Sequence, residues 1–169
     1  MPLNTQPGVP HKGWTLSGVT DLQLDEGRAF GEYEDCEFCG HEQIRYVHTL
    51  THREHPDAIR VGCICAEHLT EDYVNPRQRE GELRNRAARR DHWPKRAWKK
   101  STKGNLYLTT PDDHHVIVFP ARGGFMLRID DKPGRKVYPT KLAAQLASFD
   151  YLYLSNNSAS PSRPLRPPC

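Results

Sequence analysis

The sequence predicts an α+β protein in which two small modules are joined by a basic helix, and three observations support this prediction. Two pairs of cysteines flank a predicted hairpin in the first half of the chain. An arginine-rich segment follows, and after Gly104 the composition changes to short strands and a final helix. The 169 residues are 36% hydrophobic and include 14 prolines, a composition that favours two small cores over one large core.

The first half of the chain is predicted to contain a short lead-in and a compact module. Residues 1–13 hold three prolines and Gly8, so we expect a flexible N-terminus. The module should span residues 14–74. Alternating apolar positions predict two strands that form a hairpin, and a short helix should follow. These elements are expected over residues 42–50, 58–61 and 65–73.

Four cysteines have the spacing of metal ligands. Cys36 and Cys39 form a C-x2-C pair followed by Gly40, and Cys63 and Cys65 come directly after the predicted hairpin. Two thiolates at the first spacing can bind one ion, and glycine permits the tight turn that this requires. Because a hairpin returns its two ends to one place, the second pair should lie beside the first. The pattern predicts one structural zinc ion per chain, held by Cys36, Cys39, Cys63 and Cys65.

The second cysteine pair leaves an alternative open. Its C-x-C spacing departs from the usual C-x2-C, whereas Cys65 and His68 are separated by two residues. His68 is therefore a reserve ligand. A closed set of thiolates indicates a structural site rather than a catalytic one. The histidines near the hairpin nevertheless leave a zinc-dependent hydrolase as a third hypothesis, and they are His48, His52 and His55.

Residues 75–102 are predicted to form a basic helical connector. Asn75-Pro76 is a typical helix start, and Trp93-Pro94 should end the helix near His92. Between residues 75 and 105 the chain has 11 Lys and Arg against three acidic residues, although its overall net charge is only +3. Arginine binds phosphate in a bidentate manner, and tryptophan can stack on a base. The predicted nucleic-acid contacts are Arg77, Arg79, Arg84, Arg86, Arg89, Arg90, Lys95, Arg96, Trp98, Lys99, Lys100 and Lys103.

Residues 103–154 are predicted to form a three-stranded antiparallel sheet with a C-terminal helix. Thr140 should cap that helix, whose apolar stripe includes Phe149 and Tyr153. The strands are expected over residues 106–109, 115–119 and 125–129. The Ser, Pro and Arg of residues 155–169 predict a disordered tail.

Two resemblances extend these predictions. Three strands and a helix, with Gly104-Asn105 opening the first strand and Thr140-Lys-Leu-Ala-Ala entering the helix, are similar to the AP2-like DNA-binding fold. That family lays a three-stranded sheet in a DNA groove and backs it with the helix. The resemblance implies that residues 103–153 bind DNA.

The first module resembles a family of uncharacterised bacterial zinc-knuckle proteins and, more generally, a zinc ribbon. The matching runs are Ile44-Arg-Tyr-Val-His-Thr-Leu, His55-Pro56, Val61-Gly-Cys-Ile-Cys-Ala and Asp72-Tyr-Val-Asn-Pro-Arg. This resemblance implies a bound metal and no particular activity.

Together these patterns predict a zinc-stabilised, non-enzymatic nucleic-acid-binding protein, with DNA ahead of RNA as the partner and a regulatory or mobile-element role. The alternative is an interaction adaptor that docks an acidic protein partner through the same basic residues. The sequence has no long apolar run and no apolar segment near Met1. We therefore expect a cytoplasmic protein without a membrane partner.

Overall fold

The computed structural model describes residues 1–154, and the predicted disordered tail of residues 155–169 lies outside this range. The described residues fall into two units that divide within one helix, after Ala87. Each unit has its own sheet and its own buried core. The α+β class is therefore confirmed. None of the described helices combines the length and the apolar character needed to cross a membrane.

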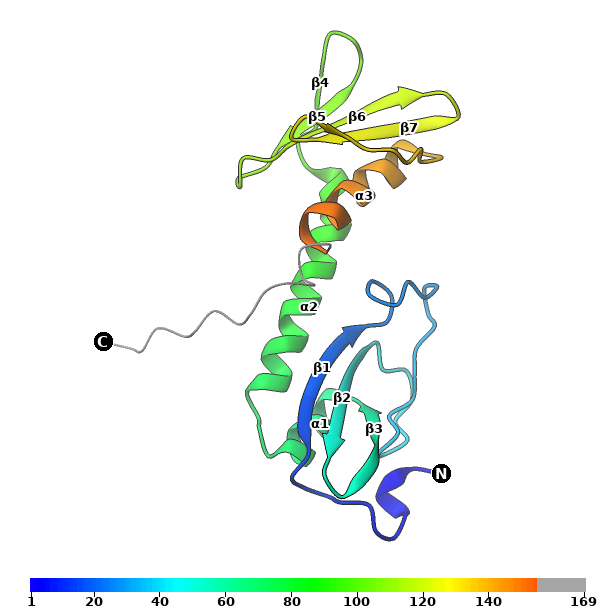
Figure 1. The fold of residues 1–169 in the computed structure, drawn as a ribbon, viewed down its shortest axis with the longest axis vertical. Helices are drawn as coiled ribbons and strands as arrows, with labels where there is room; N and C mark the ends of the chain where they lie inside the picture. Colours follow the sequence, from blue (N-terminus) through cyan, green and yellow to red (C-terminus); the bar gives the residue numbers. More distant parts are fainter. Residues whose placement is uncertain (155–169) are drawn as a thin grey trace, which may run out of the picture. The chain divides into compact units, whose positions relative to one another are not determined.

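The first unit is built on a three-stranded antiparallel sheet with the strand order β1-β2-β3 (Figure 1). Strands β2 and β3 form the predicted hairpin, and helix α1 packs beside β1 and β2. A 3₁₀ turn, η1, precedes the sheet, and helix α2 follows α1. The bounds are η1 Leu3–Thr5, β1 Thr15–Asp21, β2 Tyr46–His52, β3 His55–Val61, α1 Cys63–Thr70 and α2 Asn75–His92.

The core of this unit lies between the hairpin, α1 and the residue that precedes β1. Trp14, Leu50 and Leu69 are almost fully buried, together with one cysteine, Cys36. The Trp14 indole donates a hydrogen bond to the Pro10 carbonyl, at 2.8 Å, so its polar edge is satisfied within the core. The apolar core is small, and a cysteine is one of its members.

Two features of the first unit differ from the expectations. Strand β1 was not predicted, because its alternation is interrupted where the register with β2 shifts at Gly18. The expected flexible N-terminus is bonded to the first cysteine pair's loop. The backbone N–H groups of Leu3 and Asn4 donate to the carbonyls of Glu37 and Phe38, each at 2.9 Å.

The second unit is a five-stranded antiparallel sheet with one face covered by helix α3 (Figure 1). The strand order follows the sequence, from β4 to β8. The three central strands and the helix have the order expected from the sequence, and two short edge strands are added to them. The bounds are β4 Lys99–Lys100, β5 Leu106–Thr109, β6 His115–Ala121, β7 Gly124–Ile129, β8 Lys132–Pro133 and α3 Lys141–Tyr153.

The predicted connector does not form a separate element. Helix α2 has the predicted bounds, but its residues are divided between the two units. Trp93 then begins a 3₁₀ turn, η2 (Trp93–Lys95), and its buried indole donates to the Ser148 hydroxyl of α3 at 3.0 Å. Lys99 and Lys100 form the edge strand β4 of the second sheet. The last part of the predicted connector is not helical, because Trp93 is buried in the core of the second unit and Lys99 and Lys100 pair with β5.

The N-cap of α3 offers a test of the second unit. The Thr140 hydroxyl accepts a hydrogen bond from the backbone N–H of Ala143 at 3.0 Å. We expect Thr140→Ala to lower the free energy of opening of the α3 amides by about 1 kcal/mol, because one N–H of the first turn loses its partner. Hydrogen exchange measures this change, and the exposed Thr102 provides the control variant Thr102→Ala. Equal exchange in both variants would contradict the cap.

Candidate functional site

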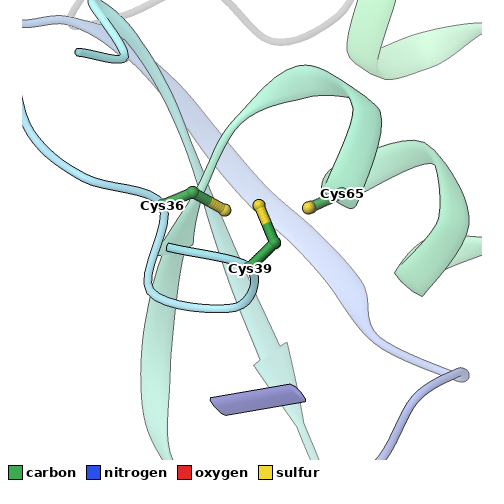
Figure 2. A group of neighbouring side chains, drawn as sticks. All are labelled: Cys36, Cys39 and Cys65. Atoms are coloured by element: carbon green, nitrogen blue, oxygen red, sulfur yellow. The ribbon is translucent and has the colours of Figure 1, made fainter. Parts of the chain in front are cut away.

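Three cysteine thiols converge in the first unit. Cys36 and Cys39 lie on the loop that precedes β2, and Cys65 lies in the first turn of α1. Figure 2 shows that their sulfur atoms point toward one another. The three Sγ atoms all lie within 4.8 Å of one another. Cys36 is buried, Cys65 is half-buried and Cys39 is exposed. We refer to Cys36, Cys39 and Cys65 as the thiol triad.

Local backbone structure explains why the first two thiols meet. The Gly40 N–H donates to the Cys36 carbonyl at 2.7 Å, which closes a tight turn around the pair. Gly40 has a φ of +73°, a left-handed conformation that glycine adopts without steric cost. A side chain there would also lie 2.9 Å from the ring of Pro2. The turn therefore requires glycine for two independent reasons.

The hairpin and α1 bring the third thiol to this turn. Strands β2 and β3 pair from His48 with Val61 to His52 with His55, so β3 returns the chain to the level of the first cysteines. Gly62, in an extended conformation, is the N-cap of α1. Cys65 thus lies in the first turn of α1, where its sulfur meets those of the first cysteine pair.

Electrostatics within the thiol triad favour one ionised sulfur. Hydrogen bonds from the Cys65 thiol and from the backbone N–H groups of Cys39 and Gly62 lower the pKa of Cys36 to about 5, although burial opposes the change. The hydrogen bond to Cys36, followed by burial, raises the pKa of the Cys65 thiol. The thiolate is the form that binds metals. The lowered pKa of Cys36 therefore favours the form of this thiol that binds a metal ion.

Neither of the two remaining predicted ligands joins the thiol triad. Because α1 begins at Cys63 rather than at Cys65, positions 63 and 65 lie about 200° apart around the helix and face different sides. The Cys63 sulfur lies 3.8 Å from a Glu67 carboxylate oxygen. Burial and the nearby carboxylates of Glu80 and Glu67 raise the pKa of Cys63 to about 12. His68 is exposed and packs edge-on against Tyr73, with ring centroids 5.8 Å apart.

The structure also groups Cys63 with residues that the sequence patterns did not connect. Cys63, His48 and Glu80 offer ligand atoms that all lie within 4.8 Å of one another. They come from α1, β2 and α2. In the sequence, His48 belonged only to a set of histidines near the hairpin, and Glu80 was one of three acids in a basic segment. The only feature of the sequence that singles out Glu80 is that it is an acidic residue within a mainly basic helix.

Four of the predicted phosphate-binding arginines are engaged in ion pairs within their own unit. Arg86 is buried and lies 2.5 Å from Asp25, and Arg90 lies 2.6 Å from Asp150. The other two hold buried or half-buried carboxylates, and these pairs are Arg77 with Glu67 and Arg84 with Glu80. A guanidinium held in this way is a poorer partner for phosphate.

Other members of the predicted basic surface contact aromatic rings. Arg89 lies over the ring of Tyr153 and Arg96 over that of Trp93. The Trp98 indole donates to the Trp93 carbonyl at 3.1 Å, and its ring packs against the core of the second unit. The remaining predicted residues are exposed, and they are Arg79, Lys95, Lys99, Lys100 and Lys103.

The sheet of the second unit has a second face, opposite the one that α3 covers. One row of directly paired residues crosses four strands, from Lys99 through Tyr107 and Ile117 to Arg128. Paired residues share a face, and neighbours along a strand alternate between faces. The row beside it, Leu108, Val116 and Ile129, is buried in the core with Phe149, so the first row points away from α3.

We call this surface the open sheet face and define it by Lys99, Tyr107, Ile117 and Arg128, together with the next pair, Phe119 and Met126. Lys99 and Arg128 are exposed, and Tyr107 and Phe119 are half-buried. Among the described residues, neither basic side chain forms an ion pair with a carboxylate. Only Lys99 was among the nucleic-acid contacts predicted from the sequence. The others become visible once strand register is known.

Comparisons with protein-family models, curated proteins and solved structures find no match to this chain.

The thiol triad predicts a specific pattern of metal loss. We expect Cys39→Ser and Cys65→Ser each to remove about one equivalent of bound zinc, because a hydroxyl is a poor ligand in place of a thiolate. Elemental analysis of the purified full chain measures the content. His68→Gln is the control and should leave it unchanged, since His68 lies outside the triad. Loss of zinc on changing His68 but not Cys65 would contradict this ligand set.

Proposed function

We propose that this chain is a zinc-stabilised, non-enzymatic nucleic-acid-binding protein, and that the open sheet face is its binding surface. The single observation that supports the surface is the row in which Lys99, Tyr107, Ile117 and Arg128 lie side by side across four strands. The row combines two positive charges with an aromatic ring, and α3 packs on the opposite face.

The chemistry of the open sheet face suits a phosphate backbone with accessible bases. Lysine and arginine attract phosphate, and arginine also binds it in a bidentate manner. Tyr107 and Phe119 offer rings on which a base can stack. The two basic residues lie at the outer strands of the row and the aromatic ring lies between them. Such an arrangement can follow a strand across the sheet.

This surface differs from the arginine-rich helix expected from the sequence. The internal ion pairs of Arg86 and Arg90 leave α2 with few free cations, which favours the sheet over the helix. The resemblance to the AP2-like fold points the same way, since that family uses the sheet and not the helix to contact DNA. We therefore keep DNA ahead of RNA as the partner.

The thiol triad supports zinc as the ion in the first unit. A set of three sulfur donors favours zinc over the hard cations magnesium and calcium, which prefer oxygen ligands. Because zinc is four-coordinate in such sites, one position remains for a further ligand. The triad lines a cavity of about 590 Å³ that His41 also lines. Cys36 belongs to the apolar core as well, so the role we propose for the metal is structural.

Binding to labelled DNA at several salt concentrations tests the proposed surface. We expect Lys99→Gln and Arg128→Gln each to reduce the slope of log affinity against log salt by roughly 0.9 on duplex DNA, or about 0.7 on a single strand. Tyr107→Thr should weaken binding to a single strand by about 1–3 kcal/mol through lost stacking. Fluorescence anisotropy measures both quantities.

Two controls separate the open sheet face from general charge effects. Lys141→Gln removes one exposed charge from the start of α3, which lies on the covered side of the same unit, and should leave the slope unchanged. Thermal unfolding of each variant checks that the unit stays folded. Equal slopes for Lys141→Gln and Arg128→Gln would contradict the surface. Absence of any salt-dependent binding to DNA or RNA would favour the adaptor hypothesis.

A further inference from the structure

His48, Cys63 and Glu80 bring three kinds of donor atom together in the first unit. They belong to β2, to the first turn of α1 and to α2, so three separate elements converge on one point. A ring nitrogen, a sulfur and a carboxylate oxygen lie within 4.8 Å of one another. None of these residues belongs to the thiol triad. The convergence is therefore a separate feature that the structural zinc does not explain.

The histidine of this group is fully buried and incompletely satisfied. His48 is 0% exposed, and its Nε2 lies 3.2 Å from the Pro76 carbonyl oxygen. Within the described part of the chain, the other ring nitrogen, Nδ1, has no hydrogen-bond partner. A buried polar atom without a partner is costly, and native structures rarely keep one. The nitrogen that faces Glu80 is Nε2, which also lies at the Pro76 carbonyl, so a metal ion would bind His48 through Nδ1 or in place of that hydrogen bond.

The carboxylate of the group is held in place by a neighbouring arginine. Arg84 donates to Oε1 of Glu80 from Nε and from a terminal nitrogen, at 2.9 and 2.5 Å. The second oxygen, Oε2, faces His48 Nε2 at 3.9 Å, which is beyond hydrogen-bond distance. Arg84 thus fixes the orientation of Glu80 and leaves one oxygen directed at the group.

A second carboxylate, that of Glu67, lies beside the Cys63 thiol. Glu67 is almost fully buried, and its Oε1 lies 3.8 Å from the Cys63 sulfur. Arg77 binds the same carboxylate through two nitrogens, one of them 3.0 Å from Oε2. Two carboxylates therefore lie close to the thiol and the histidine ring, and they favour a cation at this point.

We propose that His48, Cys63 and Glu80 form a second metal site, which takes a transition-metal ion of the zinc type. One nitrogen, one sulfur and one oxygen donor suit zinc, whereas magnesium and calcium prefer oxygen alone. Three protein ligands leave a fourth position for water or another small ligand. Cys63 and Glu80 line the same cavity of about 590 Å³ as the thiol triad, so an ion from solvent has a route to both sites.

Metal stoichiometry of the full chain tests this site. After reconstitution with zinc and removal of the excess by dialysis, the wild-type protein should hold about two equivalents. Glu80→Gln and Cys63→Ser should each reduce the content to about one equivalent. The control Glu82→Gln changes an exposed acid on the same helix and should retain both. Cys39→Ser should lose the ion of the thiol triad and keep the second.

Cobalt substitution identifies the site that each variant loses. Charge-transfer absorption from thiolate to cobalt grows with the number of sulfur ligands. We therefore expect a cobalt titration of the wild-type protein to show a strong absorption band from the thiol triad. A separate, weaker rise in absorption should come from the site of His48, Cys63 and Glu80. The weaker increment should disappear in Cys63→Ser and the strong band in Cys39→Ser.

The titration of the wild-type protein tests for the second site even if a variant fails to fold. One equivalent with a single band would overturn the proposal. So would the loss of the strong band in a folded Cys63→Ser, because that result would assign Cys63 to the same ion as the thiol triad. Survival of both increments in Glu80→Gln and in Cys63→Ser would overturn it as well.

Discussion

Three thiols from two separate segments of the chain converge at one point of the first unit, and we propose that its stability depends on this convergence. The turn that begins at Cys36 and the first turn of α1 must meet within a few ångströms. Three local features bring these thiols together, and they are the hairpin of β2 and β3, the N-cap of α1 at Gly62 and the left-handed conformation of Gly40. Even the N-terminal residues contribute, through backbone bonds to the cysteine loop.

A metal ion bound by the three thiols would stabilise the folded first unit. The unit's apolar core is small, and Cys36 is one of its buried members. Small cores rarely supply enough free energy to fold alone, and bound zinc contributes its binding free energy to folding. The lowered pKa of Cys36 favours the thiolate form that a metal ion binds. The proposed zinc would therefore add its binding free energy to that of a small apolar core.

Local signals predicted much of the fold, and contacts between distant residues explain what they missed. The bounds of α2 follow from Asn75-Pro76 and Trp93-Pro94, and the helix α3 follows from its Thr140 cap. The departure of Cys63 from the thiol triad could not be predicted, because it depends on the residue at which α1 begins.

The proposed binding surface could not be predicted from the sequence for a related reason. A run of arginines suggests a free basic face, but Asp25 and Asp150, each about sixty residues away from its partner, pair with two of them. The open sheet face requires the register of four strands. A shift of one residue in β4 would turn Lys99 toward the covered face and Lys100 away from it.

The most direct measurement of the central claim is hydrogen exchange of the full chain before and after removal of metal by a chelator. The account predicts that the amides of β2, β3 and α1 lose most of their protection, while those of β6, β7 and α3 keep theirs. Re-addition of zinc should restore the lost protection. Unchanged protection in the first unit, or equal loss in both units, would contradict the claim that the thiol triad holds a metal on which the first unit alone depends.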